Sequence, residues 1–225
     1  MTWNINGALG RNPRFDLARV VDYVRGHGPD IVALQEIDSR RARAAGVANP
    51  FDVLREALGK HGAHAHAIST ADGDYGQALI SRWPLAASAV HDLSYPEREP
   101  RRAISADVAT PMGMLRVIAT HLGLSVRERR TQARVLLDLL GPLDRPLFVM
   151  GDFNDWFWAG SVRRTLERVL PSCTHYRTFP AWLPIFELDR LYVSPAVRLA
   201  ASRTDRSASA LSDHLPVIAD IEFGG

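Results

Sequence analysis

The chain has 225 residues, of which 46% are hydrophobic and 23% are charged. This composition is that of an ordinary globular protein, and it excludes disordered, collagen-like and coiled-coil architectures. The formal net charge of +2 is too small to indicate a nucleic-acid partner by itself. Because no linker-like or repeated stretch divides the chain, we expect one domain over residues 1–225.

The single cysteine, Cys173, excludes an internal disulfide framework and is typical of a protein in a reducing compartment. No run approaches the roughly 18 consecutive apolar residues of a membrane span. The residues from Met1 to Gly7 lack the basic start and apolar run of a signal peptide. We therefore expect a cytoplasmic protein, and we expect it to be a monomer.

Helical patterns and short apolar runs follow one another irregularly along the chain. Apolar residues recur at helical spacing over 15–25, 52–58 and 126–140, the last being the clearest amphipathic pattern. Strands are expected over 31–34, 77–80, 115–119, 147–150, 191–193 and 216–221. No helical pattern separates the runs between 77 and 119, which favours antiparallel pairing there. The sequence therefore predicts an α+β fold rather than a regular alternation of strands and helices.

Polar residues lie at the ends of several of these strands, where the strand itself does not require them. They are Asn4, Asn6, Glu36, His121, Asp152, Asn154, Asp189, Asp213 and His214. Strand ends hold side chains on a rigid support, so this placement is typical of a reactive site. Each residue taken alone also has a structural interpretation; Asp152 and Asn154, for example, can form an Asx-turn.

Carboxylate and amide oxygens are the ligands that Mg²⁺ or Mn²⁺ prefers. The sequence has no Cys-x-x-Cys or His-Glu-x-x-His pattern, which argues against zinc. Beside a hard metal, a histidine can bind phosphoryl oxygens and an aspartate can activate water. The residue types therefore favour a hydrolase of phosphate esters.

Six short motifs carry a family resemblance. They are Thr2-Trp3-Asn4-Ile5-Asn6, Ala33-Leu34-Gln35-Glu36, Thr120-His121-Leu122, Gly151-Asp152-Phe153-Asn154, Leu188-Asp189-Arg190 and Ser212-Asp213-His214-Leu215-Pro216. In this order they resemble the endonuclease/exonuclease/phosphatase superfamily, which includes deoxyribonuclease I, exonuclease III-type abasic-site endonucleases, neutral sphingomyelinases and inositol polyphosphate 5-phosphatases. The resemblance covers residues 2–221. It implies a four-layer α/β/β/α sandwich of two mixed β-sheets flanked by helices, with the site at one end.

The resemblance also implies a metal site with one Mg²⁺ or Mn²⁺ ion. Glu36 would be the principal ligand, with Asn4 and Asp213 close to the cation. Asp152 would orient or deprotonate the attacking water, and Asn154 would help to hold the water and the phosphate. Relatives usually have a longer first strand, so we expect the strand that carries Asn4 to be short.

Two histidines complete the implied site. His214, held by Asp189, would contact the phosphoryl group and stabilise the developing charge, because a carboxylate supports the charged imidazole. His121 resembles the second histidine of deoxyribonuclease I, sphingomyelinases and inositol phosphatases, where abasic-site endonucleases typically have tyrosine. The implied activity is in-line hydrolysis of a phosphodiester. The alternatives are a DNA repair endonuclease or exonuclease, a phosphomonoesterase, and a catalytically silent phosphate-binding relative.

Five further residues are candidate substrate contacts: Asn6, Arg82, Arg102, Trp156 and Trp182. Arginine can bind a phosphate, although a structural salt bridge is the alternative. The aromatic residues form two clusters, Phe153, Trp156, Phe157 and Trp158, and Phe179, Trp182 and Phe186. Their rings can stack on bases, contact a lipid or cap the core. The substrate is therefore expected to be a phosphate ester of a lipid head group, a nucleic acid or a small metabolite.

Overall fold

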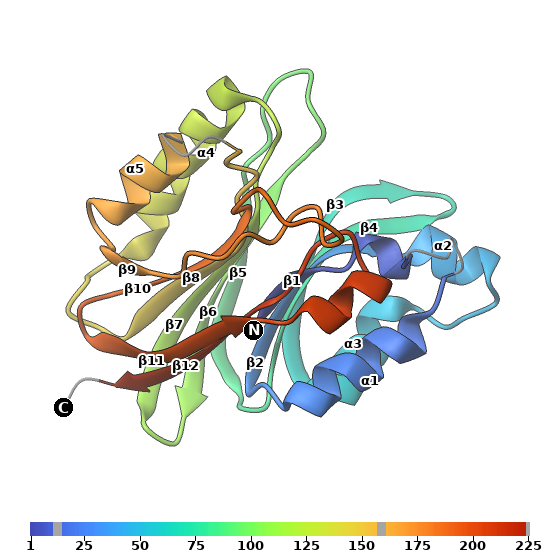
Figure 1. Ribbon diagram of the computed structural model, residues 1–225, viewed down its shortest axis with the longest axis horizontal. Coiled ribbons are helices and arrows are strands. Elements are labelled where there is room, and N and C mark those ends of the chain that lie inside the picture. The colour runs from blue at the N-terminus through green and yellow to red at the C-terminus, as the bar shows by residue number, and fades with distance from the viewer. Residues whose placement is uncertain (11–14, 157–160, 224–225) are drawn as a thin grey trace.

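The computed structural model describes residues 1–10, 15–156 and 161–223. Over these residues the chain forms two six-stranded β-sheets that pack face to face, with helices on their outer faces (Figure 1). This arrangement confirms the α+β sandwich that the sequence predicts. No helix within the described ranges is long and apolar enough to cross a membrane.

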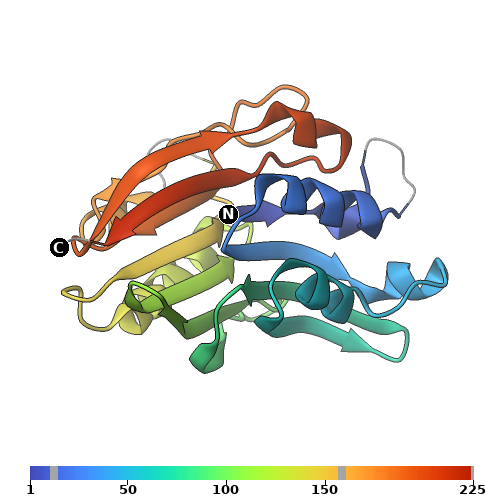
Figure 2. The same ribbon diagram turned by 90° about the horizontal axis from the view of Figure 1, so that it is seen from below.

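The first sheet contains the start and the end of the described chain. Its strands, in spatial order, are β11 (Val197–Thr204), β12 (Val217–Phe223), β1 (Thr2–Asn4), β2 (Ile31–Asp38), β4 (Gly73–Ser81) and β3 (His61–Thr70). The short β1 runs parallel to β2 and antiparallel to β12. Figure 2 shows the beginning of β1 in the middle of the molecule.

The second sheet has the order β5 (Leu85–Asp92), β6 (Arg102–Thr110), β7 (Gly113–His121), β8 (Leu147–Asp152), β10 (Asp189–Val193) and β9 (Ser172–Cys173). Only β7 and β8 are parallel among its described strand pairs. Each sheet thus contains one parallel pair among its described strands. β1, β7 and β8 end in residues of the predicted site, and β2 carries Glu36 two residues before its end.

The helices are α1 (Leu17–His27), α2 (Ser39–Ala44), α3 (Pro50–Leu58), α4 (Val126–Leu140) and α5 (Ser161–Glu167), and two 3₁₀ turns are η1 (Asn6–Ala8) and η2 (Arg206–Ala210). α1 and α3 cover the first sheet, whereas α4 and α5 cover the second (Figure 1). α4 matches its predicted range, because Ser125 and Glu128 form a capping box and Gly141 follows its last residue.

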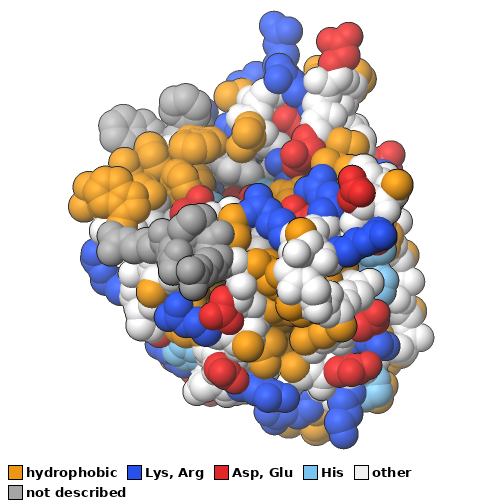
Figure 3. Space-filling view, turned by 90° about the vertical axis from the view of Figure 1, so that its right-hand side faces the viewer, with side chains coloured by type: hydrophobic (Ala, Val, Ile, Leu, Met, Phe, Trp, Pro, Cys, Tyr) orange, Lys and Arg blue, Asp and Glu red, His pale blue; other side chains and the backbone are white. Residues whose placement is uncertain are grey.

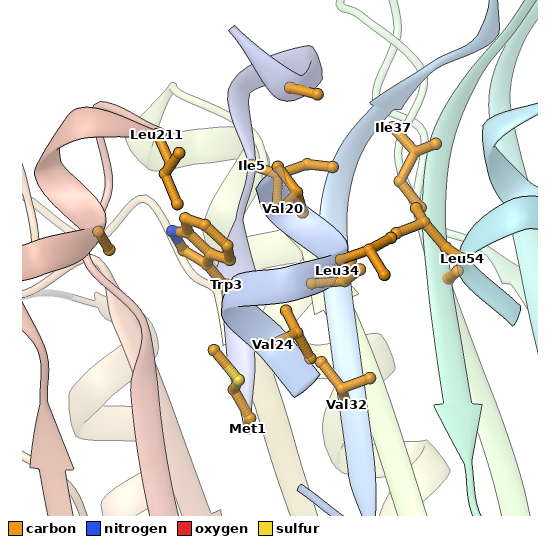
Figure 4. Close-up of a cluster of buried hydrophobic side chains, with 14 of the residues drawn as sticks. Met1, Trp3, Ile5, Val20, Val24, Val32, Leu34, Ile37, Leu54 and Leu211 are labelled. Atoms are coloured by element: carbon orange, nitrogen blue, oxygen red, sulfur yellow. The ribbon is translucent and has the colours of Figure 1, made fainter. Parts of the chain in front are cut away.

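Alternation along the strands divides the apolar residues among three layers. In β2, Ile31 and Ala33 lie between the sheets, while Val32 and Leu34 face α1 and α3. Figure 4 shows Leu34 with Trp3 and residues of α1 in this outer cluster. Trp3 is fully buried there. The sheets are therefore fixed to each other and to the helices, and their strand ends are rigid supports.

The sequence patterns missed some strands, and the antiparallel partners of β4 differ from the strands that follow it in the chain. β3 is built mainly of histidine, alanine and other small residues, and β5 is largely exposed, so neither has a strong apolar alternation. The expected antiparallel pairing holds for β5, β6 and β7. However, β4 pairs with β2 and β3 in the other sheet.

Candidate active site

Parallel strand pairs bring four predicted residues to one end of the sandwich. β1 and β2 carry Asn4 and Glu36, and β7 and β8 end side by side at His121 and Asp152. Asp152 is also the register partner of Asp189, the first residue of β10. The two sheets therefore meet at this end with polar side chains from both.

Glu36 lies in an irregular part of β2. Its φ of 59° is in the left-handed region, and the register between β2 and β4 shifts between Leu34 and Ile37. Asn4 Nδ2 donates to Glu36 Oε1 at 2.8 Å and to Asp152 Oδ2 at 3.0 Å. The bulge thus turns the Glu36 side chain toward the other sheet, and Asn4 joins the two carboxylates.

Asp152 and Asn154 lie in a tight turn at the end of β8. Asn154 N donates to Asp152 Oδ1 at 2.9 Å, and Asn154 Nδ2 donates to the Leu122 carbonyl at 2.9 Å. Gly151 before them has φ 153°, and a Cβ there would lie 1.9 Å from the Thr120 carbonyl oxygen. The Asx-turn that the sequence allows is present, and it fixes one oxygen of Asp152 while the other faces the site.

His214 and Asp189 form a buried pair. His214 Nδ1 lies 2.8 Å from Asp189 Oδ2, and His214 Nε2 lies 3.8 Å from Asp152 Oδ2. Burial by itself would lower the pKa of His214, but the charges of Asp189 and Asp152 and the hydrogen bond that the imidazole donates to Asp189 raise it to about 10. The imidazole is therefore charged at neutral pH.

His121 approaches the same carboxylate from the second sheet. Its Nε2 lies 3.5 Å from Asp152 Oδ2 and 3.9 Å from Glu36 Oε1. Burial and the charge of Arg101 lower the pKa of His121 to about 3. The site therefore presents one neutral and one charged imidazole to Asp152.

The oxygen atoms around Glu36 fit a hard divalent cation. Burial raises the pKa of Glu36, and the charges of Asp152 and Asp213 raise it further, against the hydrogen bond from Asn4. A cation would offset this repulsion among three carboxylates. The Glu36 side chain is 27% exposed and Asp213 is exposed, so both are accessible.

A second group of possible ligand atoms belongs to Asp152, Asp189 and His214, which lie within 4.8 Å of one another. Asp189 and His214 are already joined by a hydrogen bond. We therefore assign this group to hydrogen bonding and leave Glu36 as the principal candidate ligand. Asn4 directs its amide nitrogen to the carboxylates while its oxygen accepts from Asn6 N at 3.0 Å, so it positions the carboxylates.

The predicted arginines are not brought to the site. Arg82 lies beside Asp30 at the opposite end of β2 and β4, where its Nη1 is 2.7 Å from Asp30 Oδ1. Arg102 is at the correct end of β6, but its side chain is bound by Asp92 and by Ser94. Arg101 next to it takes the place expected for Arg102. Its Nη1 lies 3.1 Å from His121 Nδ1, and the residue is 6% exposed.

The two tryptophans differ in their surroundings. Trp156 is half-buried and packs edge-on against Phe179 and Phe186, whose centroids are 5.8 and 5.1 Å away. Phe179 in turn lies 4.8 Å from the His214 ring. Trp182 is 61% exposed on the loop that precedes β10. Phe157 and Trp158 lie outside the described residues.

A two-sheet α+β sandwich with carboxylates, an amide and two histidines at one end defines a class of proteins that contains hydrolases of phosphoester bonds. The family model for the Endonuclease/Exonuclease/phosphatase family matches residues 1–214. The chain belongs to this family. It is 30% identical over 241 aligned residues to the uncharacterized protein YbhP of Escherichia coli K12, covering 99% of this chain and 95% of that protein.

Solved structures show the same fold. The crystal structure of an endonuclease/exonuclease/phosphatase from Beutenbergia cavernae superposes with a TM-score of 0.79 at 21% identity, covering all of this chain and 71% of that one. The mannosyl-6-phosphatase Bt3783 of Bacteroides thetaiotaomicron gives a TM-score of 0.73 at 16% identity, covering 99% of this chain and 98% of that one. At these identities the likeness concerns the fold, and the substrate must be argued from the site.

Proposed function

We propose that this protein is a divalent-metal-dependent phosphoesterase that hydrolyses a phosphodiester by in-line attack of water. The observation that carries the proposal is the convergence on Asp152 Oδ2. Asn4 Nδ2, His121 Nε2 and His214 Nε2 lie 3.0, 3.5 and 3.8 Å from this oxygen. A structural Asx-turn does not require two imidazoles from separate segments around its carboxylate.

Asp152 is the group that orients and deprotonates the attacking water. One of its oxygens is held by Asn154 N, which fixes the carboxylate in the turn after β8. The other oxygen faces the two imidazoles and is available to accept the proton of the water. Family membership supports hydrolysis of a phosphoester as the reaction, because members of the Endonuclease/Exonuclease/phosphatase family are largely hydrolases of such bonds.

The two histidines act on the phosphoryl group in different protonation states. Charged His214, oriented by Asp189, binds a phosphoryl oxygen and stabilises the charge that develops in the transition state. Neutral His121 offers a hydrogen-bond donor without a net charge. When a Mg²⁺ or Mn²⁺ ion is bound, held by Glu36 with Asp213 nearby, it supplies further positive charge to the phosphoryl oxygens.

The test is hydrolysis of bis-p-nitrophenyl phosphate with Mg²⁺ or Mn²⁺, against an EDTA blank and the corresponding monoester. We expect diester turnover that EDTA abolishes and that falls at least about 100-fold in Glu36→Gln and Asp152→Asn. Glu222→Gln, an exposed carboxylate at the far end of β12, is the matched control. Full activity in both site variants would refute the assignment.

Other outcomes point to the alternatives. Turnover of the monoester alone would show a phosphomonoesterase. Nicking of supercoiled or abasic-site DNA at low enzyme concentration, without turnover of the small diester, would show a nuclease.

A further inference from the structure

A loop of exposed apolar side chains stands beside the candidate active site. The residues of this apolar loop are 180–186, and its Trp182, Leu183 and Ile185 are 61%, 53% and 52% exposed. Exposed apolar groups of this size are costly in water when they lie together. In Figure 3, hydrophobic side chains gather at the upper left of the face shown.

The backbone of the apolar loop is held by hydrogen bonds at its base. Phe186 N donates to the Phe179 carbonyl at 2.9 Å, and Leu183 N donates to the Pro180 carbonyl at 2.9 Å. The tip is therefore presented outward by a defined turn. The side chains of the tip are exposed because the hydrogen-bonded backbone holds them outward.

The apolar loop is joined directly to the catalytic residues. Ala181 N donates to the Asp213 carbonyl at 2.7 Å, and Asp189 N donates to Thr178 Oγ1 at 3.2 Å. The ring of Phe179 packs on His214 at 4.8 Å. A surface contacted by the tip of the loop would therefore lie at the mouth of the site.

A second exposed apolar segment follows the other histidine. Leu124 is 62% exposed and Val126 is 37% exposed, three and five residues after His121. The carbonyl of Leu122 in the same segment accepts from Asn154 Nδ2. Exposed apolar side chains thus lie on two separate segments that adjoin residues of the site, and the second of these runs into the start of α4.

Positive charge accompanies these apolar groups. Arg127 and Arg130 are exposed at the start of α4, and Arg177 is exposed just before the apolar loop. None of these three forms an ion pair within the described residues. Arg43 is exposed on α2, which begins three residues after Glu36. Apolar tips beside unpaired arginines match the hydrocarbon boundary and the phosphates of an anionic bilayer.

We propose, resting on the proposed function, that the protein docks on an anionic phospholipid surface through the apolar loop and hydrolyses a phosphodiester of a lipid head group. Leu183 and Ile185 are aliphatic, and their side chains cannot stack on bases as an aromatic platform would. Tryptophan is the side chain that favours the membrane–water interface. The combination therefore favours a lipid surface over a nucleic acid.

The first experiment measures binding, independently of turnover, by co-sedimentation with phosphatidylcholine vesicles with and without phosphatidylglycerol. We expect the protein to bind the phosphatidylglycerol vesicles at least about tenfold more tightly, with binding weakened by salt. The variant Leu183→Ser with Ile185→Ser should lose at least about tenfold in this binding. The matched control is Met112→Ser with Met114→Ser, since these side chains are 74% and 52% exposed on the β6–β7 hairpin away from the site.

The second experiment compares head-group release from these vesicles with turnover of soluble bis-p-nitrophenyl phosphate. We expect the loop variant to lose lipid hydrolysis at least about tenfold more than soluble-diester hydrolysis, and the methionine control to behave as the parent protein. Equal vesicle binding by the parent protein and the loop variant would overturn the proposed docking surface. The proposal would also be overturned if the parent protein bound DNA or another protein but did not bind the vesicles. Vesicle binding without head-group release would overturn the lipid substrate. Failure of the proposed function would be a different result, in which the parent protein hydrolyses neither the vesicle lipid nor soluble bis-p-nitrophenyl phosphate in the presence of metal.

Discussion

Arg101 and His121 form a buried pair in which the guanidinium Nη1 lies 3.1 Å from the imidazole Nδ1. The same Nη1 lies 3.5 Å from the imidazole Nε2, so the guanidinium contacts both ring nitrogens. Its positive charge and the burial of the ring lower the pKa of His121 and favour the neutral imidazole. Arg101 therefore sets the charge state of the histidine that faces Asp152 Oδ2 at 3.5 Å.

Replacing this arginine should change both turnover and titration. In Arg101→Met, we expect kcat to fall about 10–100-fold, because the partner that orients His121 is lost. The pKa of His121 should rise, since a neighbouring positive charge is removed. Arg102→Met is the control, because that side chain is bound by Asp92 and Ser94. Steady-state kinetics and NMR titration of the metal-free protein measure both effects; unchanged values for Arg101→Met would show that Arg101 neither orients His121 nor lowers its pKa.

Asp189→Asn tests the charged state of His214. We expect the pKa of His214 to fall from about 10 toward the ordinary histidine value, because the negative charge of Asp189, which raises this pKa most, is removed. The stability that the raised pKa of His214 contributes is fully present below about pH 6.5 and is lost as the pH rises through about 10. The stability difference between the two proteins should therefore be largest below about pH 6.5, shrink as the pH rises toward 10 and be absent above it. Urea denaturation across pH measures it, and a constant difference would argue against a charged His214.

Glu36→Gln should have opposite effects on the metal-free and metal-loaded proteins. The raised pKa of Glu36 means that folding disfavours the charged carboxylate. The free energy that this carboxylate costs the folded protein therefore grows as the pH rises above the ordinary glutamate pKa. We expect the metal-free variant to melt about 2–4 °C higher at pH 7, as a change of about 1 kcal/mol would produce. The increase in melting temperature that Mn²⁺ gives the parent should be absent. A normal Mn²⁺ response would show that Glu36 is not the principal ligand.

Trp3→Phe should act mainly on stability. The buried Trp3 Nε1 donates to the His214 carbonyl at 2.9 Å, and phenylalanine would leave this carbonyl without its donor. We expect a loss of about 1–3 kcal/mol in the free energy of unfolding. Denaturant titration measures it, with Phe223→Leu at the far end of β12 as the control. An unchanged free energy of unfolding in Trp3→Phe would mean that a water molecule donates to the His214 carbonyl in place of the indole.

Some features of the fold and site follow from sequence, and others depend on tertiary placement. The period of apolar residues predicts α4, which buries one face. Continuous apolar runs predict β7 and β8, the strands that carry His121 and Asp152, because β8 is buried along its whole length and β7 is buried toward its end. Arg101 lies directly before β6 and Arg102 is its first residue, so which of the two side chains contacts His121 depends on how the chain enters the strand, and this the residue types do not reveal. Residue type alone suggests Arg82 as a substrate contact. The antiparallel pairing of β2 with β4 puts this residue at the end of the sheet opposite the candidate site. The roles of the site residues remain predictions until the variants are measured.

The site joins residues that are far apart along the chain. Ser212 Oγ donates to the Asn4 carbonyl at 2.7 Å, and Thr2 pairs with Val217 across β1 and β12. Contacts of such separation form late and only after long loops have closed. Residues 2–4 therefore complete these contacts only after the 212–217 segment has been made. A chain that stops before residue 212 has no His214 and no Val217 to pair with Thr2, so it lacks part of the candidate active site.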